Sequence, residues 1–372
     1  MKKILFLINV DWFFVSHFLP VGKEAINKGY DVHLACAITD KKFKLESMGF
    51  TVHEVNISRS GTNIFKELKT MRQIYKVMKL VRPDIVEFFT IKPVIYGGIF
   101  SRLLAIPKKT FYITGLGYVF IKKGFKGFII RHIAKFLYVL AISGRNNSII
   151  TENIFDKNLI QSLNAVQDKQ ITIIRGAGVD LDKYHFIQED SKNMKVVMAC
   201  RLLKDKGVFE YLEAAKILKK KRLDIEFELY GDIDHYNPAS LTNKEVEQIK
   251  QEGLVTVHGF SSNIADVFTS SNIIVLPSYR EGLPKVLVEA AACGRAVVTT
   301  DVPGCRDAIE LNVTGLLCKV KDSNDLAEKI EHLVMDSTLR KQIGNAGRRL
   351  AEQEFDVRKI VQQHLKIYEQ EL

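Results

Sequence analysis

The feature of this 372-residue chain that most restricts its fold is the repeated alternation of short apolar runs with amphipathic segments. Apolar runs at residues 4–10 and 85–89 alternate with helical patterns, and the longest of these covers residues 65–81 after a capping Asn63 and ends before Pro83. Strands without a polar face are typical of a parallel sheet that helices cover on both sides. The sequence therefore predicts an α/β fold.

The same alternation restarts in the second half, with predicted strands at residues 196–200, 226–230, 273–276 and 296–300. A chain of 372 residues exceeds what one hydrophobic core usually supports. We therefore expect two Rossmann-like, doubly wound domains that face a central cleft. The first would cover residues 1–188, and the second would begin at residue 189, in a polar linker.

The cysteines and the hydropathy of the chain indicate the cellular environment in which the protein works. Five cysteines are widely spread without a C-x-x-C pair, which argues against a disulfide framework or a zinc site and favours a reducing compartment. The apolar start is too short for a signal peptide and is followed at once by Asp11, so we interpret it as a first strand. No stretch reaches the ~20 apolar residues of a spanning helix, so we expect a soluble or peripheral protein.

The positive charge is concentrated in the first half. Residues 1–190 carry 28 basic and 16 acidic side chains, whereas residues 191–372 carry 26 and 27. Such a bias suggests an anionic partner, although a merely basic surface also explains it. No nucleic-acid-binding motif accompanies the charge, so we do not expect nucleic acid as the partner.

Residues 120–142 combine an aromatic-rich apolar pattern with five interleaved basic residues. This pattern predicts a helix that lies in a membrane interface. A helix packed on the core with a basic outer face would have the same pattern, and the sequence does not separate the two.

Ligands of parallel sheets bind at the carboxyl ends of the strands. In the first half, this rule places loops at residues 11–17, 89–96 and 114–119 on one rim. His17 is the first candidate for chemistry there, although a lone histidine is more often structural.

A second candidate site is the stretch PSYREGLPKVLVE at residues 277–289, which follows the apolar run at residues 273–276. A strand, a tight turn and a helix that opens at Pro284 would leave free amides at a helix N-terminus, which bind anions. Glu281 lies in the turn, and Glu289 lies among apolar neighbours. A buried carboxylate needs donors, which two ligand hydroxyls would supply, whereas an exposed Glu289 needs no ligand.

Two cations follow the apolar run at residues 196–200. Arg201 and Lys206 flank a turn that carries Gly207, and a guanidinium fork with an ammonium could hold a diphosphate. Neither G-x-G-x-x-G nor G-x-x-x-x-G-K-[ST] occurs, so the motifs do not support a dinucleotide or P-loop site. Together with residues 277–289, the cations predict a site for a nucleotide diphosphate.

The stretch EGLPKVLVE resembles the E-x7-E signature of the retaining glycosyltransferases of family 4, which have the GT-B fold. Further stretches stand where that family has counterparts: Arg201 and Lys206, the GAGVD turn at residues 176–180, the Gly231-Asp232 turn, and His258-Gly259-Phe260. The resemblance covers essentially the whole chain, and the second half carries the more specific motifs.

The resemblance implies roles for these residues. Glu289 would bind the ribose hydroxyls, Arg201 and Lys206 the diphosphate, and Glu281 would face the transferred sugar. Four residues of the turn and helix start would contact sugar and phosphate: Gly282, Leu283, Lys285 and Val286. His258, Gly259 and Phe260 would border the base, and Gly231 would complete the donor-binding residues. The family typically needs no metal and no other cofactor. Its last helix normally crosses back, so the second domain would cover residues 189–356 and the returning helix residues 357–372.

The chain departs from the family pattern at two places. Pro284 stands in the usual E-G-F/L-G turn and removes one amide donor. Thr114-Gly115-Leu116-Gly117 occupies a loop where the family often has a histidine. The role of that histidine is therefore open, and His17 does not simply inherit it.

The first half is similar to a narrower group, the bacterial enzymes that extend polyprenyl-diphosphate-linked sugars in O-antigen, capsule or protein-glycan assembly. The similar stretches are DWFFVSHFLP, TIKPVIYG and TGLGYVF, which begin at residues 11, 90 and 114. They supply the acceptor-side candidates His17, Lys92, Thr114, Gly115 and Gly117.

We therefore expect transfer of a hexose or N-acetylhexosamine from a UDP-sugar to a polyprenyl-diphosphate-linked sugar. The protein would be cytoplasmic and peripheral on the anionic cytoplasmic face of the inner membrane. One alternative is a GT-B sugar-nucleotide epimerase or a transferase to a soluble acceptor. Another is a non-catalytic two-domain sugar-binding protein, a class that usually needs export.

Overall fold

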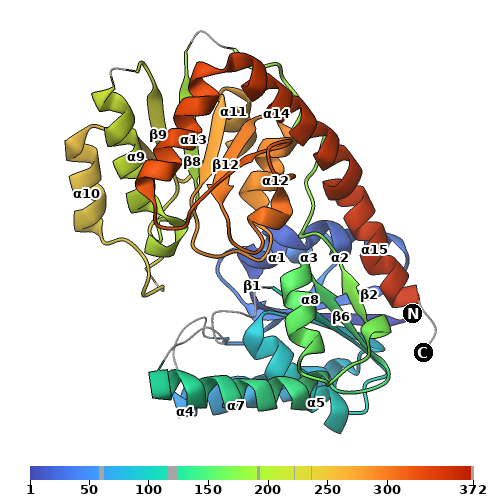
Figure 1. Cartoon of the computed structure of the whole chain (residues 1–372). Coiled ribbons are helices and arrows are strands. Elements are labelled where there is room, and N and C mark those ends of the chain that lie inside the picture. Colours follow the sequence, from blue (N-terminus) through green and yellow to red (C-terminus); the bar gives the residue numbers. More distant parts are fainter. Residues whose placement is uncertain (58–62, 115–123, 191–192, 222, 236, 370–372) are drawn as a thin grey trace. The chain divides into compact units, whose positions relative to one another are not determined.

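The computed structural model describes residues 1–57, 63–114, 124–190, 193–221, 223–235 and 237–369, without the side chains of residues 124–127. The chain forms two compact units, one of residues 1–175 and 360–372 and the other of residues 176–359 (Figure 1). Each unit has its own parallel sheet and its own core.

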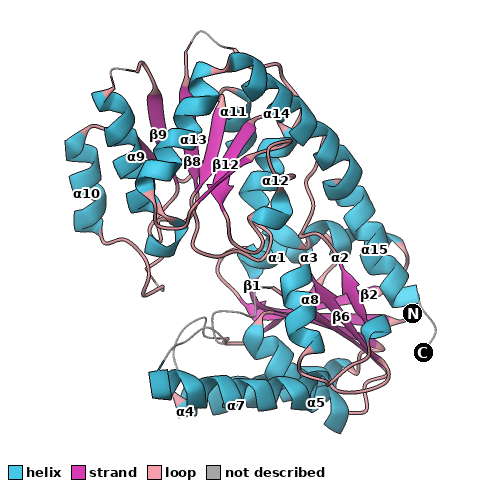
Figure 2. Cartoon of the chain, viewed as in Figure 1, coloured by secondary structure: helices cyan, strands magenta, loops and turns pink. Residues whose placement is uncertain are grey.

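Within the described residues, the first unit contains a seven-stranded parallel sheet with the order β3-β2-β1-β4-β5-β6-β7 (Figure 2). Its strands are β1 (Lys3–Val10), β2 (Asp31–Ala37), β3 (Thr51–Glu54), β4 (Ile85–Phe89), β5 (Lys108–Ile113), β6 (Asn147–Thr151) and β7 (Ile171–Ile173). The strand order reverses between β1 and β4. Such a switch point is where doubly wound sheets bind ligands.

Helices cover this sheet, and Figure 1 shows α4, α5 and α7 together along one side of it. The helical segments are α1 (Asp11–His17), α2 (Leu19–Asn27), α3 (Lys42–Glu46), α4 (Ile64–Val81), the π-helical turn η1 (Pro93–Gly97), α5 (Gly98–Leu103), α7 (Gly124–Ile142), α8 (Ile154–Gln161), the short 3-10 turn η2 (Asp168–Gln170) and α15 (Val357–Glu369). Asn63 caps α4, as predicted, by accepting a hydrogen bond from the Lys66 amide at 3.2 Å.

In the part of the second unit that the structure describes, six parallel strands follow the order β10-β9-β8-β11-β12-β13. The strands are β8 (Lys195–Ala199), β9 (Glu226–Tyr230), β10 (Thr256–Gly259), β11 (Ile273–Leu276), β12 (Ala296–Thr300) and β13 (Leu316–Cys318). The helical segments are η3 (Lys204–Lys206), α9 (Val208–Lys220), α10 (Asn243–Glu252), α11 (Ile264–Thr269), α12 (Lys285–Ala292), η4 (Arg306–Ala308), α13 (Ser323–Met335), α14 (Ser337–Leu350) and η5 (Ala351–Phe355). The switch point lies between β8 and β11.

The predicted boundary at residue 188 is wrong, because residues 176–188 belong to the second unit. Two buried arginines and one partly buried arginine hold this segment there. Arg340, which is 1% exposed, pairs with Glu189 at 2.9 Å, and Arg348 Nη1 donates to the carbonyl oxygen of Tyr184 at 2.9 Å. Arg295 donates to the carbonyl oxygen of Ile187. These partners are far apart in sequence, so the polar composition of the linker did not reveal them.

Residues 11–17 form a helix rather than the predicted loop. The buried carboxylate of Asp11 accepts hydrogen bonds from the amides of Thr39 (2.8 Å) and Lys41 (3.0 Å), which ties the start of α1 to the segment after β2. The segment at residues 120–142 is helical as predicted, from Gly124 onward, and its described part buries Tyr138 while it exposes Phe136. No described helix is both long enough and apolar enough to span a bilayer.

The last helix packs on the first unit through a buried polar contact. Glu87 in β4 is fully buried, His364 Nδ1 lies 3.1 Å from Glu87 Oε1, and the Tyr368 hydroxyl donates to Glu87 Oε2. Lys108 Nζ donates to the carbonyl oxygen of Tyr368 at 3.0 Å. A carboxylate inside a sheet needs such donors, so Glu87 determines where α15 packs.

We expect Tyr368→Phe to lower the free energy of unfolding by about 1–3 kcal/mol, because the buried Glu87 carboxylate loses a donor. Urea denaturation of the full-length protein measures this change. The control is Tyr75→Phe, since the Tyr75 ring is only partly buried and keeps its contact with Phe100. Equal stabilities of the two variants would contradict the role given to Tyr368.

Candidate functional site

The switch point of the second sheet brings together the two stretches that the sequence singles out. Arg201 and Lys206 follow β8, and residues 277–284 follow β11. The Tyr279 amide and the Ser278 hydroxyl both donate to the carbonyl oxygen of Asp205, at 2.8 and 3.2 Å. The two loops therefore form one continuous rim at the carboxyl ends of these strands.

The turn leads into α12, which begins one residue later than predicted. Pro284 is the N-cap in extended conformation (φ −73°, ψ 116°), and the helix starts at Lys285. Among the described residues, no side chain caps this end. Pro284 therefore removes only its own amide, and the first amides of α12 still point out of the helix N-terminus toward any bound anion.

Close backbone approaches shape the turn. A Cβ on Gly207 (φ +78°) would lie 2.2 Å from the carbonyl oxygen of Pro277, and one on Gly304 would lie 2.2 Å from that of Gly282. The loop that follows β8 and the loop that follows β12 are thus packed directly against the turn. Only glycine allows these approaches, so the turn is held by the backbone of its neighbours.

Two ion pairs hold the candidate cations. Lys206 Nζ contacts Glu281 Oε1, and both side chains are largely buried. Burial opposes the charge on Lys206, but the Glu281 carboxylate outweighs it, so the pKa of Lys206 is raised. Arg201 Nη1 lies 2.9 Å from Asp234 Oδ2, and the Arg201 side chain is 44% exposed. A carboxylate therefore holds each cation in place.

Two thiols lie near the same ion pair. Burial raises the pKa of Cys200 and of Cys305 to about 12, with a further rise from the Glu281 charge that the charge of Lys206 opposes. Both thiols are therefore neutral near pH 7, and neither is poised as a nucleophile. The Lys206–Glu281 ion pair is therefore the charged contact in this part of the site.

Glu289 is 7% exposed, so the interpretation of an exposed residue on an amphipathic helix is wrong. Lys285 Nζ lies 3.3 Å from Glu289 Oε1, one helical turn away. The pKa of Tyr184 is raised, first by burial and then by the charge of Glu289. A carboxylate with partial access and nearby donors can accept further hydrogen bonds from ligand hydroxyls.

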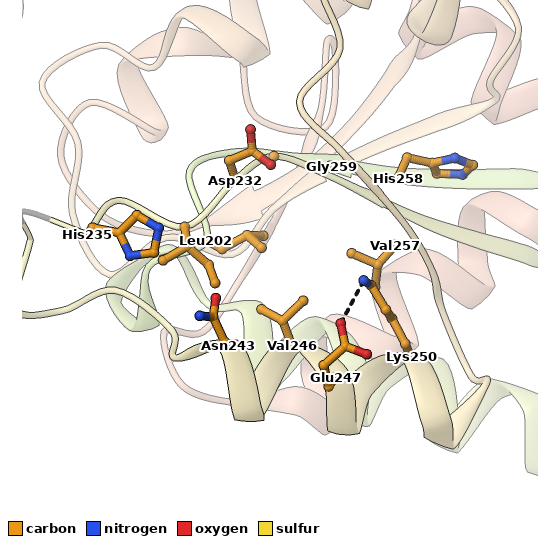
Figure 3. Close-up of a pocket in the computed structure, with 12 residues that line it drawn as sticks. Leu202, Asp232, His235, Asn243, Val246, Glu247, Lys250, Val257, His258 and Gly259 are labelled. Carbon is orange, nitrogen blue, oxygen red and sulfur yellow. Dashed lines mark hydrogen bonds and ion pairs between the residues drawn. The ribbon is translucent and has the colours of Figure 1, made fainter.

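A pocket of about 610 Å³ lies at the ends of β9 and β10, beside α10 (Figure 3). Gly231, His258 and Gly259 line it, and Figure 3 shows Asn243 and Glu247 extending into it from α10. The pocket adjoins the rim formed by β8 and β11, because β9 is the neighbour of β8. It is large enough for a small organic group.

His258 is fixed by its neighbours in the second unit. Its ring stacks on Tyr230 with centroids 4.4 Å apart and planes 8° apart, and its Nε2 lies 3.7 Å from Glu228 Oε2. Burial and a hydrogen bond to Glu228 raise the pKa of Tyr230 to about 12. Phe260 follows His258 and Gly259 and is 75% exposed. An exposed aromatic ring beside the pocket can stack on a planar ligand.

The acceptor-side candidates lie in the first unit. His17 ends α1, and its ring packs on Phe13 with centroids 4.2 Å apart. Lys92 follows β4 and pairs with Glu67 at 2.5 Å. Thr114 follows β5 and is partly exposed. Gly115 and Gly117 lie outside the described residues.

Sequence reasoning missed the side chains that hold these candidates in place. Asp234 pairs with Arg201, Tyr184 lies beside Glu289, and Glu67 pairs with Lys92. Each partner is distant in sequence or belongs to a different element. One local signal was available for α10, the helix beside the pocket. The Thr242-x-x-Glu245 capping box marks its N-terminus, and both hydrogen bonds of the box are present.

Two doubly wound parallel sheets, with paired cations and a buried carboxylate at the second switch point, are the features expected of a GT-B glycosyltransferase. Residues 3–153 match the family Glycosyl transferase 4-like, and residues 182–350 match Glycosyl transferases group 1. The chain belongs to these group 1, family 4 glycosyltransferases.

Individual relatives are similar in sequence to this chain over nearly its whole length. The N,N'-diacetylbacillosaminyl-diphospho-undecaprenol alpha-1,3-N-acetylgalactosaminyltransferase of Campylobacter jejuni is 30% identical over 369 residues, with 95% of each chain covered. The capsular polysaccharide biosynthesis glycosyltransferase CapM of Staphylococcus aureus is 28% identical, with 95% of this chain and 93% of CapM covered. The expected enzyme class is confirmed.

Solved structures confirm the GT-B fold. The structure of Anabaena HepE in complex with UDP and glucose superposes with a TM-score of 0.77 at 19% identity and covers 99% of both chains. WaaG, a glycosyltransferase involved in lipopolysaccharide biosynthesis, superposes with a TM-score of 0.77 at 15% identity and covers 99% of this chain and 100% of WaaG.

The glycine contacts lead to a stability prediction. We expect Gly207→Ala to lower the free energy of unfolding by about 2–4 kcal/mol, because a left-handed backbone penalty adds to a clash with Pro277. Gly253→Ala is the matched control, since Gly253 also has positive φ (+62°) but open space around its Cβ. It should cost only about 1 kcal/mol. Equal losses in thermal or urea denaturation would contradict the close approach.

Proposed function

We propose that this enzyme transfers a hexose or N-acetylhexosamine from a UDP-sugar to a polyprenyl-diphosphate-linked sugar, with retention of anomeric configuration. One observation supports the UDP-sugar donor. Arg201, Lys206 and the N-terminus of α12 all lie at the switch point of the second sheet. Cations and helix amides together suit a diphosphate.

The diphosphate would replace the carboxylates that now pair with Arg201 and Lys206. Arg201 and Lys206 now contact Asp234 and Glu281, and a phosphate oxygen can accept the same hydrogen bonds as a carboxylate. As the bond from the sugar to UDP breaks, negative charge grows on the leaving phosphate, and fixed cations and amides stabilise it. In this proposal the protein's own charges do this work, without a metal or another cofactor.

The rest of the donor would extend on both sides of the diphosphate. Buried Glu289 would accept hydrogen bonds from the ribose hydroxyls, and Glu281 would face the transferred sugar. The backbone amides of the turn, at Gly282, Leu283, Lys285 and Val286, would contact sugar and phosphate. The base would lie by the pocket that includes Gly231, His258 and Gly259, next to the exposed ring of Phe260.

The names of the relatives support the two substrates. The Campylobacter jejuni relative is named for an acceptor in which a sugar is linked through diphosphate to undecaprenol. An Escherichia coli relative, 23% identical over 326 residues, is named UDP-Gal:alpha-D-GlcNAc-diphosphoundecaprenol alpha-1,3-galactosyltransferase. HepE is also solved in complex with UDP-glucose. These names motivate a UDP-sugar donor and a lipid-linked acceptor here.

The donor site has a direct kinetic test. We expect Arg201→Ala and Glu289→Ala to lower kcat/KM on the order of 10²-fold, because each removes a hydrogen-bonding group that holds the donor or stabilises its leaving group. Lys204→Ala is the control, since Lys204 lies in the same loop but is exposed and pairs with Glu245 at 2.9 Å.

The assay supplies a panel of UDP-hexoses and UDP-N-acetylhexosamines with a short-chain polyprenyl-diphosphate sugar and measures UDP release and product. Conversion of the donor without any acceptor would indicate an epimerase instead. Transfer only to free sugars would indicate a soluble acceptor. Folded Arg201→Ala and Glu289→Ala variants with full turnover would overturn the site.

We further propose peripheral attachment to the anionic cytoplasmic face of the inner membrane through α7. The described part of this helix exposes Ile133 (54%) and Phe136 (66%), together with Phe128, Ile129, Ile130 and Leu140. Arg131 and Lys135 lie among them. An apolar surface with interleaved cations matches a bilayer interface that carries anionic headgroups, and such a surface would bring the enzyme to a lipid-linked acceptor.

We expect the protein to float with liposomes that contain anionic lipid, and the double variant Ile133→Asp/Phe136→Asp to lose most of this binding. High salt should weaken the wild-type interaction only in part, because apolar burial remains. The control is Leu311→Asp/Met335→Asp, two exposed apolar positions of the second unit. Failure of the wild type to float under either salt condition would contradict membrane attachment.

A further inference from the structure

The switch point of the first sheet contains an unusual loop. Thr90, the first residue after β4, has a left-handed backbone (φ +68°), which is rare for a β-branched residue. The chain then enters η1, a π-helical turn, and such turns are frequent at functional sites. Strained backbone at the place where doubly wound sheets bind ligands points to a binding role.

Two side chains of this loop donate hydrogen bonds to one carboxylate, that of Glu67. Lys92 Nζ lies 2.5 Å from Glu67 Oε1, and the Tyr96 hydroxyl donates to Glu67 Oε2 at 2.7 Å. Lys92 and Tyr96 are one turn apart on the same segment, whereas Glu67 comes from α4. The Lys92 and Glu67 side chains keep 21% and 16% exposure, so solvent reaches the contact.

The Tyr96 hydroxyl keeps its proton and therefore remains a hydrogen-bond donor. Burial, followed by the hydrogen bond to Glu67 and its charge, raises the pKa of Tyr96 well above its usual value. An ammonium and a phenol therefore present their donors to the two oxygens of one anionic group. A phosphate offers oxygens of the same kind, with more charge.

We propose that Lys92 and Tyr96 form the subsite for a phosphate of the acceptor's diphosphate, and that Glu67 occupies this subsite until the acceptor displaces it. This inference rests on the proposed function, because it assumes an acceptor that carries a diphosphate. Glu67 is then a built-in competitor that keeps the Lys92 ammonium oriented.

The position of Glu67 on α4 favours an amphiphilic ligand. The same helical turn exposes Ile64 (71%), Phe65 (83%) and Leu68 (56%). An anion held by Lys92 would therefore lie close to an apolar surface that can contact a hydrocarbon chain. A soluble phosphate would use only the polar half of this arrangement.

A purely structural brace between α4 and η1 would contain the same contacts but would respond differently to mutation. Loss of a brace lowers stability and leaves the acceptor KM unchanged. Loss of a competitor instead strengthens binding of the anion, because less of the subsite is blocked.

The test uses the full-length protein, a saturating UDP-sugar and a polyprenyl-diphosphate-linked N-acetylhexosamine. Lys92→Met should raise the acceptor KM by about tenfold or more, and Lys92→Arg should restore part of it. Glu67→Gln should lower the acceptor KM and strengthen inhibition by inorganic diphosphate. The control Lys69→Met removes an exposed lysine from the same helix and should change neither value.

A second acceptor, the matching polyprenyl glycoside without diphosphate, separates charge recognition from lipid recognition. Its KM should be the same in the wild type and in Lys92→Met. If Lys92→Met leaves the diphosphate acceptor's KM unchanged, or if Glu67→Gln only lowers the melting temperature, the subsite is wrong. If the wild type transfers no sugar to any diphosphate acceptor, the proposed function itself fails, and this result is distinct from the others.

Discussion

The burial of both sheets on two faces is the constraint on which the rest of this structure depends. β11 and β12 are buried along their whole length, and the central strands of the first sheet are nearly so. A charged side chain inside such a sheet must have its own buried partners, as Glu87 does with His364 and Tyr368. The charged functional candidates of the loops therefore gather beyond the strand ends, where the sheet order reverses and loops from neighbouring strands meet.

The charged candidates share a second property, which is that each cation holds a carboxylate of the same unit. Lys206 contacts Glu281, Arg201 contacts Asp234, and Lys92 contacts Glu67. A cation that is already desolvated in part and oriented loses little when a phosphate replaces the carboxylate. The pairs therefore keep the sites ordered while they remain open to exchange, which suits an enzyme that binds and releases charged substrates.

Glycine contacts complete this design in the second unit. The turn at residues 277–284 is shaped by the backbones of Gly207 and Gly304, which approach it more closely than any side chain would allow. The helix that follows begins at Lys285 and carries the buried Glu289 one turn later. The positions of the turn, of the helix amides and of the carboxylate are thus set together by packing around one loop.

The sequence by itself determined the buried strands and the loops where charge could gather. The strands β11 and β12 have the predicted bounds, because a short run with almost no charged residues signals a fully buried strand. It also predicted that Arg201, Lys206 and Glu281 lie in loops that follow strands and that Glu289 lies in the next helix, because local spacing sets these positions. Only the tertiary structure decided the partners Asp234, Glu67 and Tyr184, the packing of α15 on Glu87, and the attachment of residues 176–188 to the second unit. These features depend on contacts between residues far apart in the chain, and neither periodicity nor local propensity specifies which distant side chain completes a buried charge.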